Sequence, residues 1–188
     1  MMNHNTMAPD RQAVLNRFLA SVERRAFRMA QIATGNTDDA LDVVQDTMMT
    51  LVKKYSDKDE AEWGPLFQTI LQSRIRDWYR RSSVRNRLRS WLHGPDDDDN
   101  ADPLDSMPDQ HGKTPEQRLY LDHAAAALNA ALHELPLRQQ QAFLLRNWEG
   151  MDVAQTAHAM GCTTGTVKTH YSRAVHSLRD TLEQHHDE

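Results

Sequence analysis

The segment from His93 to Lys113 divides this chain into two helical parts, and it constrains the fold more than any other feature. It has no apolar periodicity, contains two glycines and three prolines, and includes the run Asp96–Asp99. That composition favours an extended, self-repelling linker. An EF-hand does not explain the aspartates, because a central glycine and a terminal bidentate glutamate are missing. The 188 residues therefore predict two modest domains rather than one large one.

Before the linker, apolar residues recur at steps of three and four, which predicts helices. The first helix is expected from Pro9 to about Gly35. A second begins with Thr37 as its N-cap and buries an apolar stripe between Ala40 and Leu51. A third begins near Trp63 and ends at Arg80–Arg81. The outward face of the second helix is polar, as in any amphipathic helix, but it also carries a methionine.

Charge is segregated along the chain. The net charge of -5 argues against a protein that coats nucleic acid by itself. Between Arg74 and Arg89, however, seven arginines accompany the single acid Asp77, whereas the stretch from Asp96 to Asp109 holds seven aspartates and no base. Arginines interleaved with aromatics suit a surface that holds unstacked bases. The alternative is that Trp78 belongs to the core and the arginines only solvate a helix end.

After the linker, a second helical domain is expected to begin at Pro115, and Leu135–Pro136 ends its first helix. Asp152 is expected to cap a short helix, Gly161 to form a tight turn, and Thr163 to cap a long last helix. This order is typical of a helix-turn-helix. No segment has the alternating pattern of a strand, so the chain is expected to be all-α.

The last helix has two distinct faces when it is drawn at 100° per residue. Its inward stripe consists of Val167, Tyr171, Ala174, Leu178 and Leu182. Its opposite face consists of Lys168, Thr169, Ser172, Arg173 and His176. The second face suits the major groove of DNA, because long cations reach phosphates or guanines and short hydroxyl residues permit close approach. A merely solvated polar face is the simpler alternative.

The second half contains LHELP at 132–136, RQQQAFLLR at 138–146, WEG at 148–150 and GCTTGTVKT at 161–169. These motifs resemble the fourth conserved region of sigma-70-family factors, and the chain resembles the extracytoplasmic-function type of that family in both halves. The segment that docks on the polymerase β′ clamp helices resembles DALDVVQDTMM at 39–49. The segment that melts and reads the minus-ten element resembles LFQTILQSRIRDWYRR at 66–81. The resemblance spans about residues 11–90 and 116–183.

The resemblance implies three sets of contact residues. Polymerase contacts are implied for Asp42, Gln45, Asp46 and Met49. Minus-ten contacts are implied for Gln72, Ser73, Arg74, Arg76, Asp77, Arg80 and Arg81. Minus-thirty-five contacts are implied for Thr164, Gly165, Lys168, Thr169, Ser172 and Arg173. Many relatives have an asparagine at the position of Ser73, so the base preferred there is left open.

The expected architecture is two small helical domains with a flexible acidic connection. The boundaries are a disordered N-terminus at 1–10, a first domain at 11–92, the linker at 93–114, a helix-turn-helix domain at 115–184 and a tail at 185–188. The partners implied are core RNA polymerase, through the β′ clamp helices and the β flap, promoter DNA, and an anti-sigma factor. The function implied is that of an alternative, stress-responsive sigma factor.

No catalytic, cofactor or metal site is expected. The chain lacks GxSxG, Walker and HExxH motifs, its ten histidines are scattered, and Cys162 is its one cysteine. No apolar run approaches the roughly 20 residues that cross a bilayer, and no signal peptide is recognised, so a cytoplasmic protein without membrane insertion is expected. Two rival functions stay open: a helix-turn-helix regulator whose first part senses a signal, and a sigma mimic that sequesters a partner. The basic, aromatic segment argues against the mimic.

Overall fold

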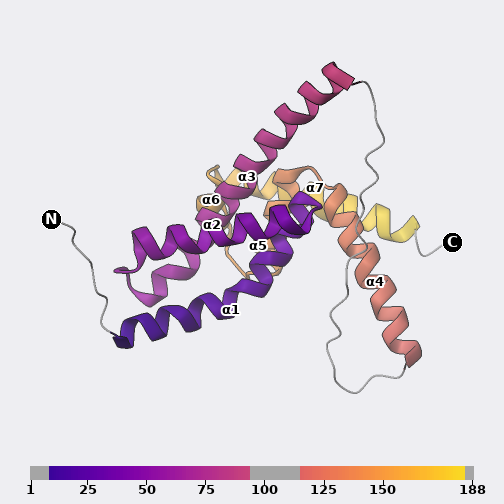
Figure 1. The fold of residues 1–188 in the computed structure, drawn as a ribbon. Helices are drawn as coiled ribbons and strands as arrows, with labels where there is room; N and C mark the ends of the chain where they lie inside the picture. The colour runs from indigo at the N-terminus through magenta and orange to yellow at the C-terminus, as the bar shows by residue number, and fades with distance from the viewer. Residues whose placement is uncertain (1–8, 94–114, 185–188) are drawn as a thin grey trace.

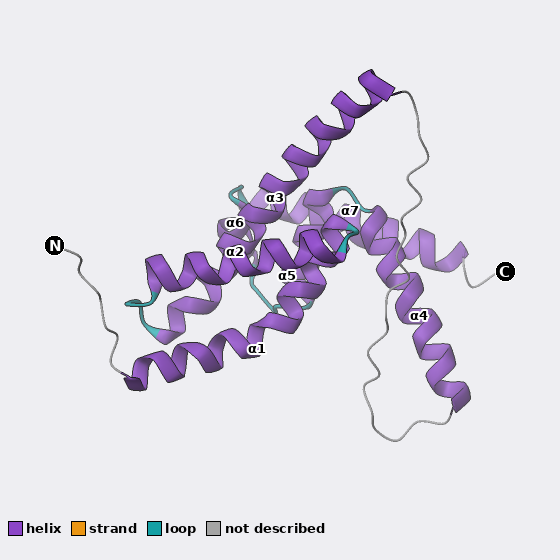
Figure 2. Cartoon of the chain, viewed as in Figure 1, coloured by secondary structure: helices purple, strands orange, loops and turns teal. Residues whose placement is uncertain are grey.

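The computed structural model describes residues 9–93 and 115–184, and these residues form helices joined by short turns (Figure 2). The all-α expectation is therefore confirmed for the described part of the chain. In chain order the helices are α1 (Pro9–Thr34), α2 (Thr37–Tyr55), α3 (Glu60–His93), α4 (Pro115–Glu134), α5 (Leu137–Asn147), α6 (Val153–Met160) and α7 (Thr164–Gln184). The N-terminal residues before α1, the tail 185–188 and the predicted linker beyond His93 lie outside the described residues.

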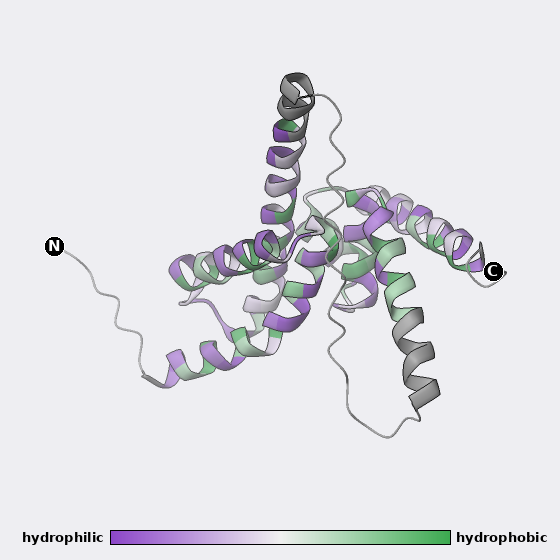
Figure 3. Cartoon of the chain, turned by 45° about the vertical axis from the view of Figure 1, so that its right-hand side comes forward, coloured by the Kyte–Doolittle hydropathy of each residue, from purple (hydrophilic) through white to green (hydrophobic). Residues whose placement is uncertain are grey.

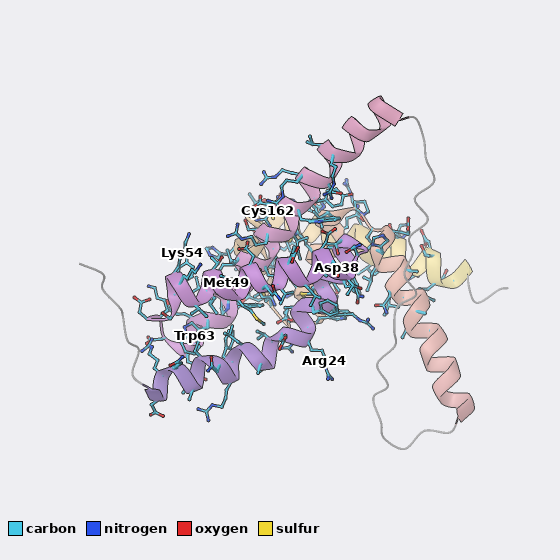
Figure 4. All side chains as sticks on the ribbon, viewed as in Figure 1. Arg24, Asp38, Met49, Lys54, Trp63 and Cys162 are labelled. Carbon is cyan, nitrogen blue, oxygen red and sulfur yellow. The ribbon has the colours of Figure 1, made fainter. Side chains whose placement is uncertain are left out.

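Helices α1, α2 and α3 form the first half of the molecule around an aromatic centre. Trp63 and Phe67 of α3 are fully buried. The ring centroid of Phe18 in α1 lies 5.7 Å from that of Trp63 and 6.2 Å from that of Phe67. Trp63 Nε1 donates to the Tyr55 carbonyl at 3.0 Å, which satisfies the buried indole and ties α3 to the end of α2. Trp63 lies at the end of α3 that is tucked between α1 and α2 (Figure 4). These contacts position α3 relative to α1 and α2.

Two predicted helix boundaries in this half are wrong. The N-cap of α2 is Asn36 and not Thr37, because the Asn36 side chain accepts a hydrogen bond from the Asp39 backbone N–H at 3.0 Å. Helix α3 does not end at Arg80–Arg81 but continues to His93. Between Arg81 and Gly94 the sequence contains no proline or glycine. It contains several arginines and leucines, and arginine and leucine both favour helix. The last turns of α3 project from the body (Figure 1).

Helices α4 to α7 form the second half, which ends in the predicted helix-turn-helix. Asp152 caps α6 and exchanges hydrogen bonds with Gln155 in a capping box, while Gly161 adopts the left-handed conformation at φ 63°. Thr163 caps α7 by accepting from the Thr166 backbone N–H at 3.2 Å. Leu145, Met160 and Val167 fill the space between α5, α6 and α7. The short helix, turn and long helix are confirmed as predicted.

The two halves pack against each other. Helix α3 lies against α6, and α1 contacts both α4 and α5. Buried apolar residues of the second half join the core of the first half, namely Ala131, Leu132, Leu135, Leu144, Ala174 and Leu178. Apolar positions face the centre where the helices meet, whereas the outward faces are mostly polar (Figure 3). Within the two described ranges, no helix combines the length and hydrophobicity needed to cross a membrane.

Candidate functional site

One face of α2 carries all the predicted polymerase contacts. The buried residues of this helix recur at steps of three and four, which leaves the opposite side to solvent. The exposed side includes Asp42, Gln45, Asp46 and Met49. Met49 leaves 53% of its surface exposed, and Leu41 and Val52 are also exposed on the same helix. Exposed apolar side chains beside carboxylates are typical of a protein-binding surface.

An ion pair ties this face to α3. Arg74 Nε lies 2.8 Å from Asp46 Oδ2, and Arg74 Nη2 donates to Thr50 Oγ1 at 3.2 Å. The structure therefore joins a predicted polymerase contact to a predicted minus-ten contact. Sequence reasoning missed this pair because the two residues lie on different helices whose relative placement depends on the core.

A groove of about 370 Å³ lies between α2 and α3. Its lining consists of Asp39, Asp42, Val43 and Asp46 from α2 and of Arg74, Trp78, Arg81 and Arg85 from α3. Trp78 packs partly against the core, and its Nε1 has no hydrogen-bond partner among the described residues. One wall is therefore anionic and the other cationic, with an indole between them. An indole plane can stack with a base or an aromatic side chain.

The predicted minus-ten residues do not form one exposed surface. Four of them are partly buried, namely Ser73, Arg74, Arg76 and Asp77. Arg80 and Arg81 are exposed, and Arg80 pairs with Asp77 one turn away. Gln72 points inward and leaves only 2% of its surface exposed. Its amide donates to Gln68 Oε1 at 3.3 Å, so in this arrangement the side chain does not face solvent.

Arg76 lies under the second half of the molecule. Its Nη1 is 3.5 Å from the Ala159 carbonyl at the end of α6, and Arg138 Nη1 donates to the next carbonyl, that of Met160, at 2.7 Å. Burial, followed by the Arg138 guanidinium, lowers the pKa of Arg76. Cys162, in the turn after α6, lies beside α3 at the same place (Figure 4). Two arginines from the two halves thus converge on one helix end.

Further polar contacts lie along the interface between the two halves, which we call the seam. Gln141 Nε2 donates to the Gln72 carbonyl at 3.2 Å, and His133 Nδ1 lies 2.7 Å from the Ile32 carbonyl. At another edge, Arg25 Nε lies 3.5 Å from Glu149 Oε1. Apart from Gln72, none of these residues was assigned a contact role from the sequence. The one available signal is the pair of glutamines at buried positions of α5, Gln140 and Gln141, where an amphipathic helix would bury apolar residues.

The recognition face of α7 is fully open. All six predicted minus-thirty-five residues are exposed, namely Thr164, Gly165, Lys168, Thr169, Ser172 and Arg173. On the inward side, Val167, Ala174 and Leu178 are buried, as the helical drawing predicts. Helix α7 therefore presents two cations with short hydroxyl side chains, the mixture that suits base edges and phosphates.

His170 lies at the edge of this face. Its Nδ1 is buried without a hydrogen-bond partner among the described residues. Burial first, and then Arg138 and Arg173, lower the pKa of His170. The lowered pKa disfavours the charged imidazole, and the cations exposed on this face are Lys168 and Arg173. No cluster of three or more potential metal ligands occurs within the part of the chain that the structure describes.

Comparisons with known proteins agree with this geometry. The family Sigma-70, region 4 matches residues 125–178, which contain most of α4 to α7. The ECF RNA polymerase sigma factor SigE of Mycolicibacterium smegmatis is 28% identical over 165 residues, covering 87% of this chain and 60% of the relative. The RNA polymerase sigma-E factor of Streptomyces coelicolor is 30% identical over 122 residues, covering 62% of this chain and 63% of the relative. Over most of its length, this chain is similar to sigma-70-family factors of the extracytoplasmic-function (ECF) group.

The resemblance to ECF sigma factors extends to the fold. The sigma factor RpoE of Bartonella quintana, solved in complex with the anti-sigma factor NepR, matches with a TM-score of 0.64 and 25% identity, over 89% of this chain and 96% of that chain. The chain spans about three fifths of the length of the curated ECF sigma factors cited above. The similarity to ECF sigma factors therefore extends over both halves of the molecule, whereas the family match covers the second half alone.

Proposed function

We propose that this chain is an ECF sigma factor that directs core RNA polymerase to specific promoters and starts transcription there. The observation that carries the proposal is the presence, in one chain, of the open cationic face of α7 and of the acidic face of α2 beside an arginine-rich α3. A helix-turn-helix alone would suit many DNA-binding proteins. The α2–α3 pair adds a surface for a second macromolecule.

Each surface has its own role in this proposal. Asp42, Gln45, Asp46 and Met49 dock on the β′ clamp helices, and the second half contacts the β flap. Arg80 and Arg81, with the partly buried residues before them, attract the backbone of the opened minus-ten strand. Lys168 and Arg173 hold the minus-thirty-five element. The chain itself performs binding and strand opening, and polymerase performs the chemistry.

The proposed domains follow the two halves, residues 11–92 and 115–184.

The function also includes a regulatory partner. A solved relative of similar fold binds an anti-sigma factor, which supports the proposal that this chain is held inactive by an anti-sigma factor of its own and released under stress. The proposed place of action is the cytoplasm, where polymerase and promoter DNA are found.

In vitro transcription tests the function directly. Core polymerase with the purified chain is expected to start transcripts from defined sites in a genomic promoter library, and core polymerase alone is not. A helix-turn-helix regulator would instead bind an operator tightly without polymerase and start nothing. A sigma mimic would bind core polymerase but leave the promoter duplex closed, as permanganate reactivity of thymines would report.

A further inference from the structure

The groove between α2 and α3 has the size and the charges of a small-molecule site. Its volume of about 370 Å³ falls in the range of about 300–1,000 Å³ that is typical of ligand pockets. Four of its charged residues form no ion pair within the described ranges, namely Asp39, Asp42, Arg81 and Arg85. The groove therefore presents charged groups of both signs that a ligand can pair with.

The α3 wall of the groove suits a phosphate group. Arg81 and Arg85 are one helical turn apart and both are exposed, so their guanidinium groups lie on the same side of α3. A guanidinium group binds phosphate oxygens through a pair of N–H donors. Among the lining residues, Arg74 is already paired with Asp46 at 2.8 Å. Arg81 and Arg85 are therefore the cations that an anionic ligand would meet.

The α2 wall suits a group with adjacent hydrogen-bond donors. Asp39 and Asp42 are three residues apart on one face of α2, and their carboxylates only accept hydrogen bonds. Guanine has two adjacent donors, N1–H and the N2 amino group, and one carboxylate can accept both. The other common bases place a ring acceptor or carbonyl oxygens beside their donor, where a carboxylate repels them. The aspartate wall therefore favours guanine among the bases.

Trp78 lies between the two walls and suits a planar base. Its ring is partly buried and lines the groove. An indole stacks on a base of any sequence. Its Nε1 is buried and has no hydrogen-bond partner among the described residues. An unpaired buried donor is costly, and a ligand acceptor such as guanine O6 can satisfy it. The tryptophan thus suits the same ligand as the two charged walls.

We propose that this groove binds a free guanine nucleotide, with the base at Asp42 and Trp78 and the phosphates at Arg81 and Arg85. Three aspartates line the α2 wall and would repel the backbone of a continuing strand, so a single nucleotide fits better than a nucleotide within DNA. Asp42 also belongs to the proposed polymerase contacts, so the nucleotide and polymerase compete for it. The nucleotide therefore restrains docking, an effect that rests on the function proposed above.

Isothermal titration calorimetry of the full-length chain tests the site with GDP, ADP, pyrophosphate and a single-stranded trinucleotide that has guanine at its centre. GDP should bind at least about tenfold more tightly than ADP or pyrophosphate, since hydrogen bonds to a carboxylate distinguish the probes. Equal affinities for GDP and ADP, or no binding of GDP, would overturn the proposal. A trinucleotide that binds as tightly as GDP would also overturn it, because the site would then belong to an opened strand.

Matched variants test whether the ligand lies in the groove. Asp42→Asn places an amide against the guanine donors and should lower GDP affinity at least several-fold. Asp38→Asn makes the same change at an exposed position in the first turn of α2, outside the groove, and should not alter it (Figure 4). Arg85→Ala should weaken GDP binding several-fold, whereas Arg24→Ala, at an exposed position of α1, should not. Equal effects of Asp42→Asn and Asp38→Asn would show that the ligand binds elsewhere.

Biolayer interferometry with core polymerase tests the competition. GDP should weaken docking of the parent chain several-fold, and ADP at the same concentration should not. Docking of Arg85→Ala should respond less to GDP than docking of the parent does. If GDP binds the chain but leaves docking unchanged, the competition is refuted. If the chain docks on polymerase but binds no GDP, the nucleotide site is refuted and the proposed function stands. If it binds GDP but never docks, the site stands and the proposed function fails.

Discussion

Arg74 of α3 forms an ion pair with Asp46 of α2, with Nε 2.8 Å from Oδ2. This pair links the proposed polymerase surface to the proposed promoter surface. The carboxylate keeps 57% of its side chain exposed and can still meet a partner. A cation on polymerase that approaches Asp46 would compete with Arg74. Arg74 would then be free to turn toward DNA, which would couple docking to promoter capture.

The ion pair can be tested by a double-mutant cycle on affinity for core polymerase. Asp46→Asn should weaken binding strongly, because the docking charge is lost, and Asp46→Arg with Gln45→Ala should abolish it. Arg74→Ala should change affinity by no more than about fivefold, since a partly exposed pair contributes about 0.2–1 kcal/mol. Biolayer interferometry would measure each variant. Additive effects of Asp46→Asn and Arg74→Ala would contradict the coupling.

The aromatic centre of the first half should dominate its stability. Phe67 has no exposed surface and packs against Phe18. Phe67→Ala should therefore lower the free energy of unfolding by about 3–5 kcal/mol. Val84→Ala, at a side chain with 66% of its surface exposed, should change it by less than about 0.5 kcal/mol. Urea denaturation followed by circular dichroism would measure both, and similar midpoints for the two variants would contradict this packing.

Local pattern was sufficient to predict the helix-turn-helix and the faces of α7. Val167, Ala174 and Leu178 are buried and Lys168 is exposed because helical periodicity alone decides which side meets the core. The N-cap of α2 was misplaced by one residue, since Asn36 and Thr37 are both competent caps and only the turn geometry selects between them.

The seam could not be predicted in the same way. Arg76 meets Ala159, and His133 meets Ile32, because two packed halves bring distant segments together. No local pattern encodes such contacts, and the intervening acidic segment pointed instead to independent domains. The resemblance to sigma factors likewise identified candidate contact residues without indicating that Gln72 faces inward.

The capping box of α6 should support the helix-turn-helix. Asp152 Oδ1 accepts from the Gln155 backbone N–H at 2.8 Å. Asp152→Ala removes this bond and should cost about 0.5–2 kcal/mol, whereas Asp152→Asn retains a capping oxygen and should cost less. Thermal unfolding with a minus-thirty-five gel shift would measure both effects. An Asn variant as unstable as the Ala variant would show that charge, and not capping, is the stabilising feature.

Strand opening should depend on Ser73 and Arg76. Ser73→Ala and Arg76→Ala should leave closed-complex affinity nearly unchanged but slow promoter opening, and an artificial bubble spanning the minus-ten element should relieve the defect. Arg85→Ala, which removes an equal charge further along α3, serves as the control for general electrostatics. Permanganate reactivity of unpaired thymines would follow opening in time. Parental opening rates in both variants would show that this segment does not melt DNA.

Two kinds of DNA contact can be distinguished on the recognition face of α7, namely a base contact and a phosphate contact. Arg173 is exposed, and a guanidinium can bind guanine bidentately. Arg173→Ala should therefore weaken minus-thirty-five binding by about 1–3 kcal/mol and relax preference at one base pair. Lys168→Ala removes a cation suited to phosphate, so it should weaken binding to all sequences alike and lower the slope of log affinity against log salt by about one unit.

Position along the helix supplies the control for this last prediction. Arg179 is exposed on α7, two turns beyond Ser172, whereas recognition helices read bases with their N-terminal residues. Arg179→Ala should therefore alter neither sequence preference nor, by more than a fraction of a unit, the salt slope. Gel shifts of the polymerase-bound chain over a salt series, on parent and single-substituted minus-thirty-five elements, would measure all three variants. If Arg173→Ala and Arg179→Ala behaved alike, Arg173 would contribute only general positive charge, and the base contact assigned to it would be wrong.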